Sequence, residues 1–170
     1  MKRPGTRLLA VLALVATGAA AEDATFKPFV LASSGPGTME ARSEETIDAL
    51  EAAGFRLVGR HSPVPDSEVL VVTSDALLAA AAASARGGYA AGQRISVSQV
   101  DEGVEVAFVN PVYLQYAYRL GADLGPVRAA LTDALGYVRD CGGGDKEMTA
   151  ERLGKYRYMM GMQQFDDPSE

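Results

Sequence analysis

The pattern that most limits the fold lies between residues 95 and 108, where apolar and polar side chains alternate in two runs. The runs, 95–100 and 104–108, are separated by Asp101-Glu102-Gly103, a stretch that favours a turn. Strict alternation places every second side chain on the same face of a strand, and two such strands joined by a short turn form an antiparallel hairpin. The sequence therefore predicts a hairpin with one buried face.

The rest of the chain carries strand and helix signals in mixed order. Ser43 is expected to cap a helix, and Pro63 and Pro65 are expected to end the strand that precedes them. Strands are expected at 26–32, 55–60 and 69–73, a loop at 33–37, and helices at 44–53, 75–85, 111–120, 124–135 and 150–160. Adjacent strands with interspersed helices are typical of an α+β fold. We expect a mainly antiparallel sheet of about five strands with helices packed on one face.

The first residues have the three-part layout of a secretory signal peptide. Basic residues precede the apolar run 8–16, and the small residues Ala19-Ala20-Ala21 precede an acidic pair. The apolar run is shorter than the roughly 20 residues that a membrane-spanning helix needs. We therefore expect cleavage near Ala21, export to the periplasm or the medium, and no transmembrane span in the mature chain. The expected organisation is a signal peptide at 1–21, an N-terminal strand and loop at 22–42, and a single α+β domain at 43–168.

The composition excludes several classes of function. The chain of 170 residues has a net charge of −6 and no run of basic residues longer than a pair, which argues against nucleic-acid binding. One His and one Cys are too few for a zinc site or for a catalytic Cys–His pair supported by another His. Cys141 precedes three glycines, so we expect it in an exposed loop, either as a free thiol or in a disulfide between two chains.

Two segments concentrate residue types that are common at recognition surfaces. In the 111–120 helix, Tyr113 and Tyr116 share one face, and Arg119 lies elsewhere on its circumference. Tyr156 and Tyr158 are close together near the C-terminus. The first hypothesis is a non-catalytic binding or interaction module that presents these two segments as one surface. Its ligand is a small molecule or a protein, and a second copy of the chain, as a homodimer, is a further candidate partner.

Two other hypotheses stay open. Met159 and Met162 are three residues apart and could offer thioethers to a soft ion such as copper, with His61 or Met148 as a further ligand. The third hypothesis is a small enzyme in which His61, the one side chain suited to acid–base work near neutral pH, is catalytic. No cofactor is indicated by any motif.

Short motifs recur in order along residues 46–168: Gly54-Phe55, Gly88-Tyr89, Gln93-Arg94, Asn110-Pro111-Val112-Tyr113, Lys155-Tyr156-Arg157-Tyr158-Met159, Gly161-Met162 and Phe165-Asp166-Asp167-Pro168. Together they resemble exported members of the domain of unknown function 302 family. The resemblance implies a small α+β domain without an established activity, and it supplies no catalytic residue. It adds Gln93, Arg94 and Asn110 to the candidate ligand-binding residues. Val109 stands where some members have Cys, and Arg157 stands where others have His, which weakens a metal or haem interpretation of the C-terminal motif.

Overall fold

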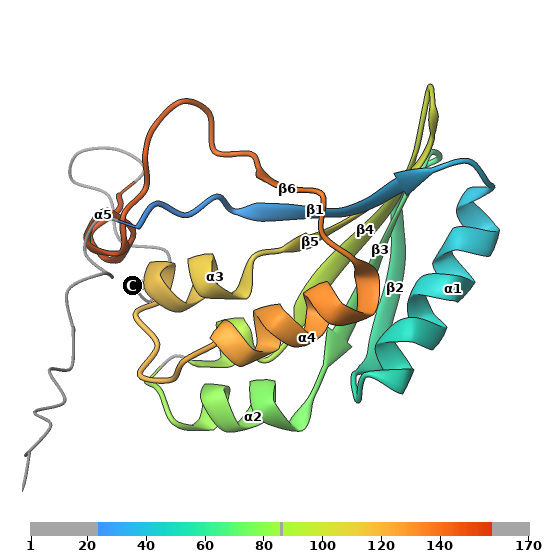
Figure 1. Cartoon of the computed structure of the whole chain (residues 1–170). Helices are drawn as coiled ribbons and strands as arrows, with labels where there is room; N and C mark the ends of the chain where they lie inside the picture. Colours follow the sequence, from blue (N-terminus) through green and yellow to red (C-terminus); the bar gives the residue numbers. More distant parts are fainter. Residues whose placement is uncertain (1–23, 86, 158–170) are drawn as a thin grey trace, which may run out of the picture.

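The computed structural model describes residues 24–85 and 87–157, which form one antiparallel sheet with helices against it (Figure 1). The strand order is β2-β3-β4-β5-β1-β6. The α+β class is confirmed, with six strands in place of about five. The elements are β1 (Phe29–Gly35), α1 (Met39–Ala52), β2 (Arg56–Val64), β3 (Ser67–Thr73), α2 (Asp75–Ala82), the short 3-10 helix η1 (Gly87–Ala90), β4 (Gln93–Val100), β5 (Gly103–Val109), α3 (Pro111–Ala117), α4 (Gly125–Leu135), β6 (Arg139–Cys141) and α5 (Ala150–Gly154).

The hairpin expected from the alternating pattern is formed by β4 and β5. Ile95 pairs with Phe108 and Val97 with Val106, and all four side chains are buried on the same face. Gly103 turns the chain with a φ of +138°, and a Cβ there would lie 2.3 Å from the Gly35 carbonyl oxygen. Only glycine fits such a position without strain.

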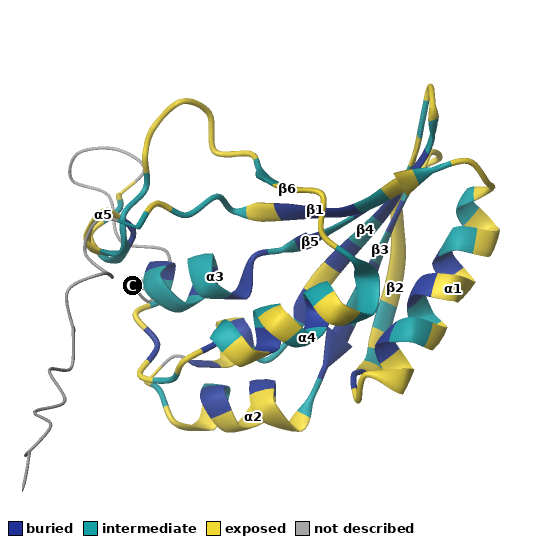
Figure 2. Ribbon diagram, in the orientation of Figure 1, coloured by how far each residue is buried: buried dark blue, intermediate teal, exposed yellow. Residues whose placement is uncertain are grey.

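The hydrophobic core lies between one face of the sheet and helices α1, α2 and α4 (Figure 2). Leu50, Leu77 and Leu131, one from each helix, are at most 1% exposed. They pack with the inward residues of β3, β4 and β5 in one continuous cluster. The buried residues of α3 and α5, among them Leu114 and Leu153, lie outside that cluster.

The opposite face of the sheet, here called the open face, is defined by Phe29, Val69, Val71, Arg94, Ser96, Ala107 and Val109. Ala107 pairs with Ser96, and Ser96 pairs with Val69, so these side chains form a row across three strands. Phe29 pairs with Val109 in the next row. All seven defining residues are half-buried or exposed. Most of the residues that define the open face are apolar, whereas the outward face of an antiparallel sheet is usually polar.

The start of α1 differs from the sequence prediction. The helix begins at Met39, and the Thr38 hydroxyl caps it by accepting a hydrogen bond of 3.3 Å from the Ala41 amide. The prediction that Ser43 is the cap was wrong, because Thr38 already satisfies the helix terminus one turn earlier. Ser43 instead lies inside α1 and is fully buried.

Strand β2 was also predicted too short. It continues through Pro63 to Val64, so the expectation that Pro63 ends it was wrong. β2 is an edge strand of the sheet. Proline has no N–H to donate, and an edge strand has no neighbour on its outer side that would need this hydrogen bond.

Several other boundaries shift. The first strand runs from Phe29 to Gly35, which takes up most of the loop expected at 33–37. The helices expected to end at 85 and 120 end at Ala82 and Ala117. The helical conformation does not continue to residue 120, because Arg119 has a φ of +54°, in the left-handed region. α5 ends at Gly154, earlier than the expected residue 160.

A polar cluster is enclosed where α1 crosses β2 and β3. The Ser43 hydroxyl and the Arg60 Nε each donate a hydrogen bond of 2.5 Å to the Glu68 carboxylate. Arg60 also donates from Nη1 to Glu44 at 2.8 Å. The hydrogen bond from Arg60 lowers the pKa of Glu68 below its usual range, with a smaller contribution from Ser43, against the opposing effect of burial. The cluster fixes α1 to the edge of the sheet.

Candidate functional site

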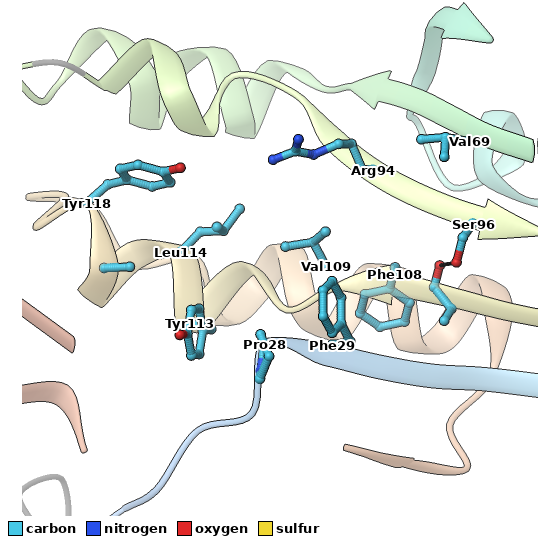
Figure 3. Close-up of a pocket in the computed structure, with 12 residues that line it drawn as sticks. Pro28, Phe29, Val69, Arg94, Ser96, Phe108, Val109, Tyr113, Leu114 and Tyr118 are labelled. Atoms are coloured by element: carbon cyan, nitrogen blue, oxygen red, sulfur yellow. Dashed lines mark hydrogen bonds between the residues drawn. The ribbon is translucent and has the colours of Figure 1, made fainter. Parts of the chain in front are cut away.

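A groove of about 420 Å³ lies between α3 and the open face (Figure 3). Its floor comes from β3, β4 and β5 together with Leu114, one wall from the rest of α3, and another from the chain that enters β1. This groove is called the α3 groove below. Its lining residues are Pro28, Phe29, Val69, Arg94, Ser96, Ala107, Phe108, Val109, Tyr113, Leu114, Ala117 and Tyr118.

Asn110 and Pro111 place α3 beside the groove. The Asn110 carboxamide caps the helix by accepting from the Val112 amide at 3.1 Å, and its Nδ2 donates to the Lys27 carbonyl oxygen at 3.0 Å. Pro111 fits the first helical turn, where its missing N–H costs nothing. The Asn-Pro pair thus joins the end of β5, the start of α3 and the segment before β1. Asn110 is 1% exposed and has a structural role.

Two tyrosines stand on the α3 side of the groove. The ring of Tyr118 stacks on Tyr89 from η1, with centroids 5.0 Å apart and an interplanar angle of 7°. Tyr113 is half-buried, and this burial, together with the nearby Tyr156, raises the pKa of its phenol above the usual value. The raised pKa keeps the Tyr113 phenol neutral at physiological pH, so it can donate a hydrogen bond.

Among the described residues that line the groove, Arg94 is the only charged one. In Figure 3 its side chain extends toward Tyr118, whose hydroxyl points back toward the guanidinium. The remaining polar group is the Ser96 hydroxyl, which donates to the Ala107 carbonyl oxygen at 3.4 Å. The groove thus combines an apolar floor with one positive charge and two phenols.

The structure separates Gln93 from its neighbour Arg94. The two residues point to opposite faces of β4, because Gln93 pairs with the buried Val72 and Arg94 pairs with Val71 on the open face. Gln93 is 0% exposed, and within the described residues its carboxamide nitrogen and oxygen have no hydrogen-bond partner. Of this predicted pair, only Arg94 belongs to the groove.

The predicted tyrosine row on α3 is also divided. Tyr113 lines the α3 groove, whereas the Tyr116 ring lies 4.9 Å from the ring of Phe26. Tyr156 follows α5 and lines a second hollow of about 730 Å³ together with Met148 and Arg157. Arg119 follows α3 and is not among the groove's lining residues. The packing of α5 on α3 brings Tyr156 near Tyr113, so the two segments do adjoin.

The other candidates have varied positions. Tyr158, Met159 and Met162 lie outside the described residues. His61 is exposed on the edge strand β2 and pairs with Val69. Among the residues that the structure describes, no group of three or more His, Cys, Asp or Glu side chains is placed to hold a metal ion. In the same part of the chain, no helix is long and apolar enough to cross a membrane.

Cys141 is placed differently from its prediction. It is half-buried in β6 and pairs with Phe29, so the expectation that it lies in an exposed loop was wrong. The glycines that follow it have positive φ values and form the turn out of this strand. β6 escaped the sequence analysis because three residues are too few to show an alternating pattern.

Most of the groove residues were missed by the sequence analysis. Phe29, Val69 and Ala107 were identified only as strand residues, and neither Val109 nor Tyr118 was among the candidate ligand-binding residues. A usable signal did exist at the end of β5, where the last two outward positions, Ala107 and Val109, are apolar. An outward apolar pair indicates that a strand face is not simply exposed to water.

The comparisons with known proteins identify the fold. No family model matches the chain, and no curated protein matches it. The fold is that of a solved structure described as an uncharacterized conserved protein DUF302 from Bacillus stearothermophilus. The TM-score is 0.54 at 18% sequence identity, over 68% of this chain and 100% of that chain. The similarity shows that this chain has a fold like that of the domain of unknown function 302 protein.

Proposed function

We propose that this protein is a non-catalytic binding module that takes up a small, largely apolar molecule in the α3 groove. The observation that carries the proposal is the apolar lining of a concave site between α3 and the open face. Its volume of about 420 Å³ falls within the range of about 300–1,000 Å³ that is common for small-molecule sites. A few convergent polar groups in such a site fix the orientation of a ligand.

The lining also supports binding without catalysis. None of the described residues that line the groove is a His, Cys, Asp or Glu. The Ser96 hydroxyl is engaged by a backbone carbonyl and has no base beside it among the lining residues. A nucleophile needs an adjacent base or a lowered pKa to react at neutral pH.

A blocking variant tests the proposal. Ala107 lies on the groove floor. Glu105 lies two residues earlier on the same strand, so its side chain points to the same side of the sheet, but it does not line the groove. Binding of sodium octanoate, 1-octanol and octylamine is measured by titration calorimetry. We expect at least one probe to bind the unmodified protein and the Glu105→Trp variant, and to lose binding at least tenfold in Ala107→Trp. Failure of all three probes to bind, or equal binding by Ala107→Trp, would refute the proposal.

We further propose that residues 1–21 direct export and are removed. The basic residues, the short apolar run and Ala19-Ala20-Ala21 support this assignment. Fractionation of expressing cells followed by N-terminal sequencing tests it. The expected product is an extracytoplasmic protein that begins at Glu22, and an intact N-terminus in the cytoplasm would contradict the assignment.

A further inference from the structure

Arg94 differs from several arginines of the sheet and its helices that form ion pairs with acidic side chains. Arg56 is paired with Asp75 at 2.9 Å, Arg60 with Glu68, and Arg128 with Asp140 at 2.8 Å. Within the described part of the chain, Arg94 has neither an ion pair nor a hydrogen-bond partner. Its guanidinium lies at an apolar groove, and none of the described residues that line this groove is acidic. A cation in this position leaves a charge to be matched by whatever occupies the groove.

The surroundings of Arg94 limit the chemistry of that occupant. The guanidinium is a planar donor that binds carboxylates through two parallel hydrogen bonds. Tyr113 and Tyr118 lie on the facing wall, and phenols also donate to an anion. Away from these groups, the floor is formed by Ala107, Val109 and Leu114 and offers only apolar contact. An anionic head beside Arg94 and an apolar body over the floor would match both parts of the site.

We infer that the α3 groove selects small monocarboxylates with an apolar body, and that Arg94 binds the carboxylate. The inference rests on the proposed function, since it specifies the ligand of the same groove. Arg94 then determines the preference for a negatively charged head group, and the apolar floor provides affinity for any ligand with an apolar body. A neutral molecule of the same shape is therefore bound more weakly, and a cation is bound most weakly of the three.

Three matched probes distinguish the role of Arg94 from the role of the apolar floor. Octanoate, 1-octanol and octylamine have the same apolar chain and differ in the charge of the head group. Calorimetric titration at neutral pH and low salt is expected to give about tenfold tighter binding for octanoate than for 1-octanol, because a charge-assisted hydrogen bond at a partly exposed site contributes about 1.4 kcal/mol. The preference should decrease as the salt concentration rises.

Substitutions of Arg94 then locate the preference. Arg94→Gln should bind octanoate and 1-octanol equally, with little change in the affinity for 1-octanol. Arg94→Lys should retain part of the preference, because it keeps the charge but loses the planar pair of donors. Arg56→Gln is the matched control, since it also removes one exposed positive charge but lies outside the groove, and it should behave as the unmodified protein.

The outcomes distinguish the inference from the proposed function. Equal binding of octanoate and 1-octanol by the unmodified protein, with both lost in Ala107→Trp, would overturn the role of Arg94 and leave the binding module intact. A preference for octanoate that survives in Arg94→Gln would likewise overturn it. Absence of binding by all three probes would overturn the proposed function itself.

Discussion

The rings of Tyr89 and Tyr118 are stacked, with centroids 5.0 Å apart and planes inclined by only 7°. Tyr118 lines the α3 groove, whereas Tyr89 belongs to η1 and is not a lining residue. The stack therefore holds one wall of the groove in position from outside. It also connects the groove to the segment between α2 and β4.

The Tyr89→Ala variant tests this support. An aromatic pair contributes about 0.5–1.5 kcal/mol beyond its buried area, so loss of the partner ring should leave Tyr118 less well positioned and weaken octanoate binding by about two- to tenfold. Tyr89→Phe keeps the ring and should bind as the unmodified protein. Calorimetry measures both, and equal affinity for Tyr89→Ala would show that the stack does not support the site.

Substitution of Gln93 should stabilise the protein without affecting ligand binding. Its carboxamide is completely buried without a partner among the described residues, and such a group costs about 1–3 kcal/mol. Gln93→Met has a similar unbranched shape and should raise the free energy of unfolding by about 1–2 kcal/mol in urea denaturation. A decrease of that size would mean that the carboxamide has a partner, and loss of octanoate binding would contradict its place outside the groove.

Glu68 should make stability depend on acid pH. Its pKa is lower in the folded protein than in the unfolded chain, mainly because Arg60 donates a hydrogen bond to the carboxylate. This contribution is fully present above the unfolded-state pKa and is lost as the pH falls through the folded-state pKa. Glu68→Gln should therefore be less stable than the unmodified protein at pH 7, by about 1–3 kcal/mol, and nearly as stable at pH 2–3. Urea denaturation at both pH values checks this, and a pH-independent difference would exclude the proposed linkage.

Asn110 should contribute to stability through two separable hydrogen bonds. Asn110→Ala removes the cap of α3 and should lower the free energy of unfolding by about 1–2 kcal/mol. Asn110→Ser keeps a side-chain oxygen that can accept from the Val112 amide but loses the donor to the Lys27 carbonyl oxygen, so its loss should be smaller. Thermal and urea unfolding measure both variants. Equal losses would show that the cap itself contributes little.

The sequence was informative wherever a periodic pattern extended over several turns or strand residues. The alternation at 95–108 predicted the β4–β5 hairpin, and the spacing of Leu124, Val127 and Leu131 predicted α4, because both patterns report which side chains face one core. The ends of helices were predicted less accurately, because neighbouring residues compete to cap the same helix. Thr38 and Ser43 are both suitable caps, and only the packing of Ser43 against Glu68 excludes the second.

The site could be predicted only in part. Arg94 and Tyr113 were identified as candidate ligand-binding residues and do share the α3 groove. The rest of the groove comes from residues that are distant in sequence, such as Phe29 and Val69, and these are brought together by the strand order. The pairing of β1 with β5 depends on the strand order of the whole sheet, which the apolar–polar pattern of neighbouring residues does not reveal. Gln93 shows the reverse error, since proximity in sequence to Arg94 did not imply the same face of β4.

The most direct test of ligand binding in the α3 groove is a nuclear magnetic resonance titration of isotope-labelled protein with sodium octanoate. We expect chemical-shift changes that concentrate at Arg94, Ala107, Tyr113 and Tyr118, that saturate, and that are absent in Ala107→Trp. Changes confined to other parts of the molecule, such as the exposed edge strand β2, or no saturable change at all, would contradict binding in this groove.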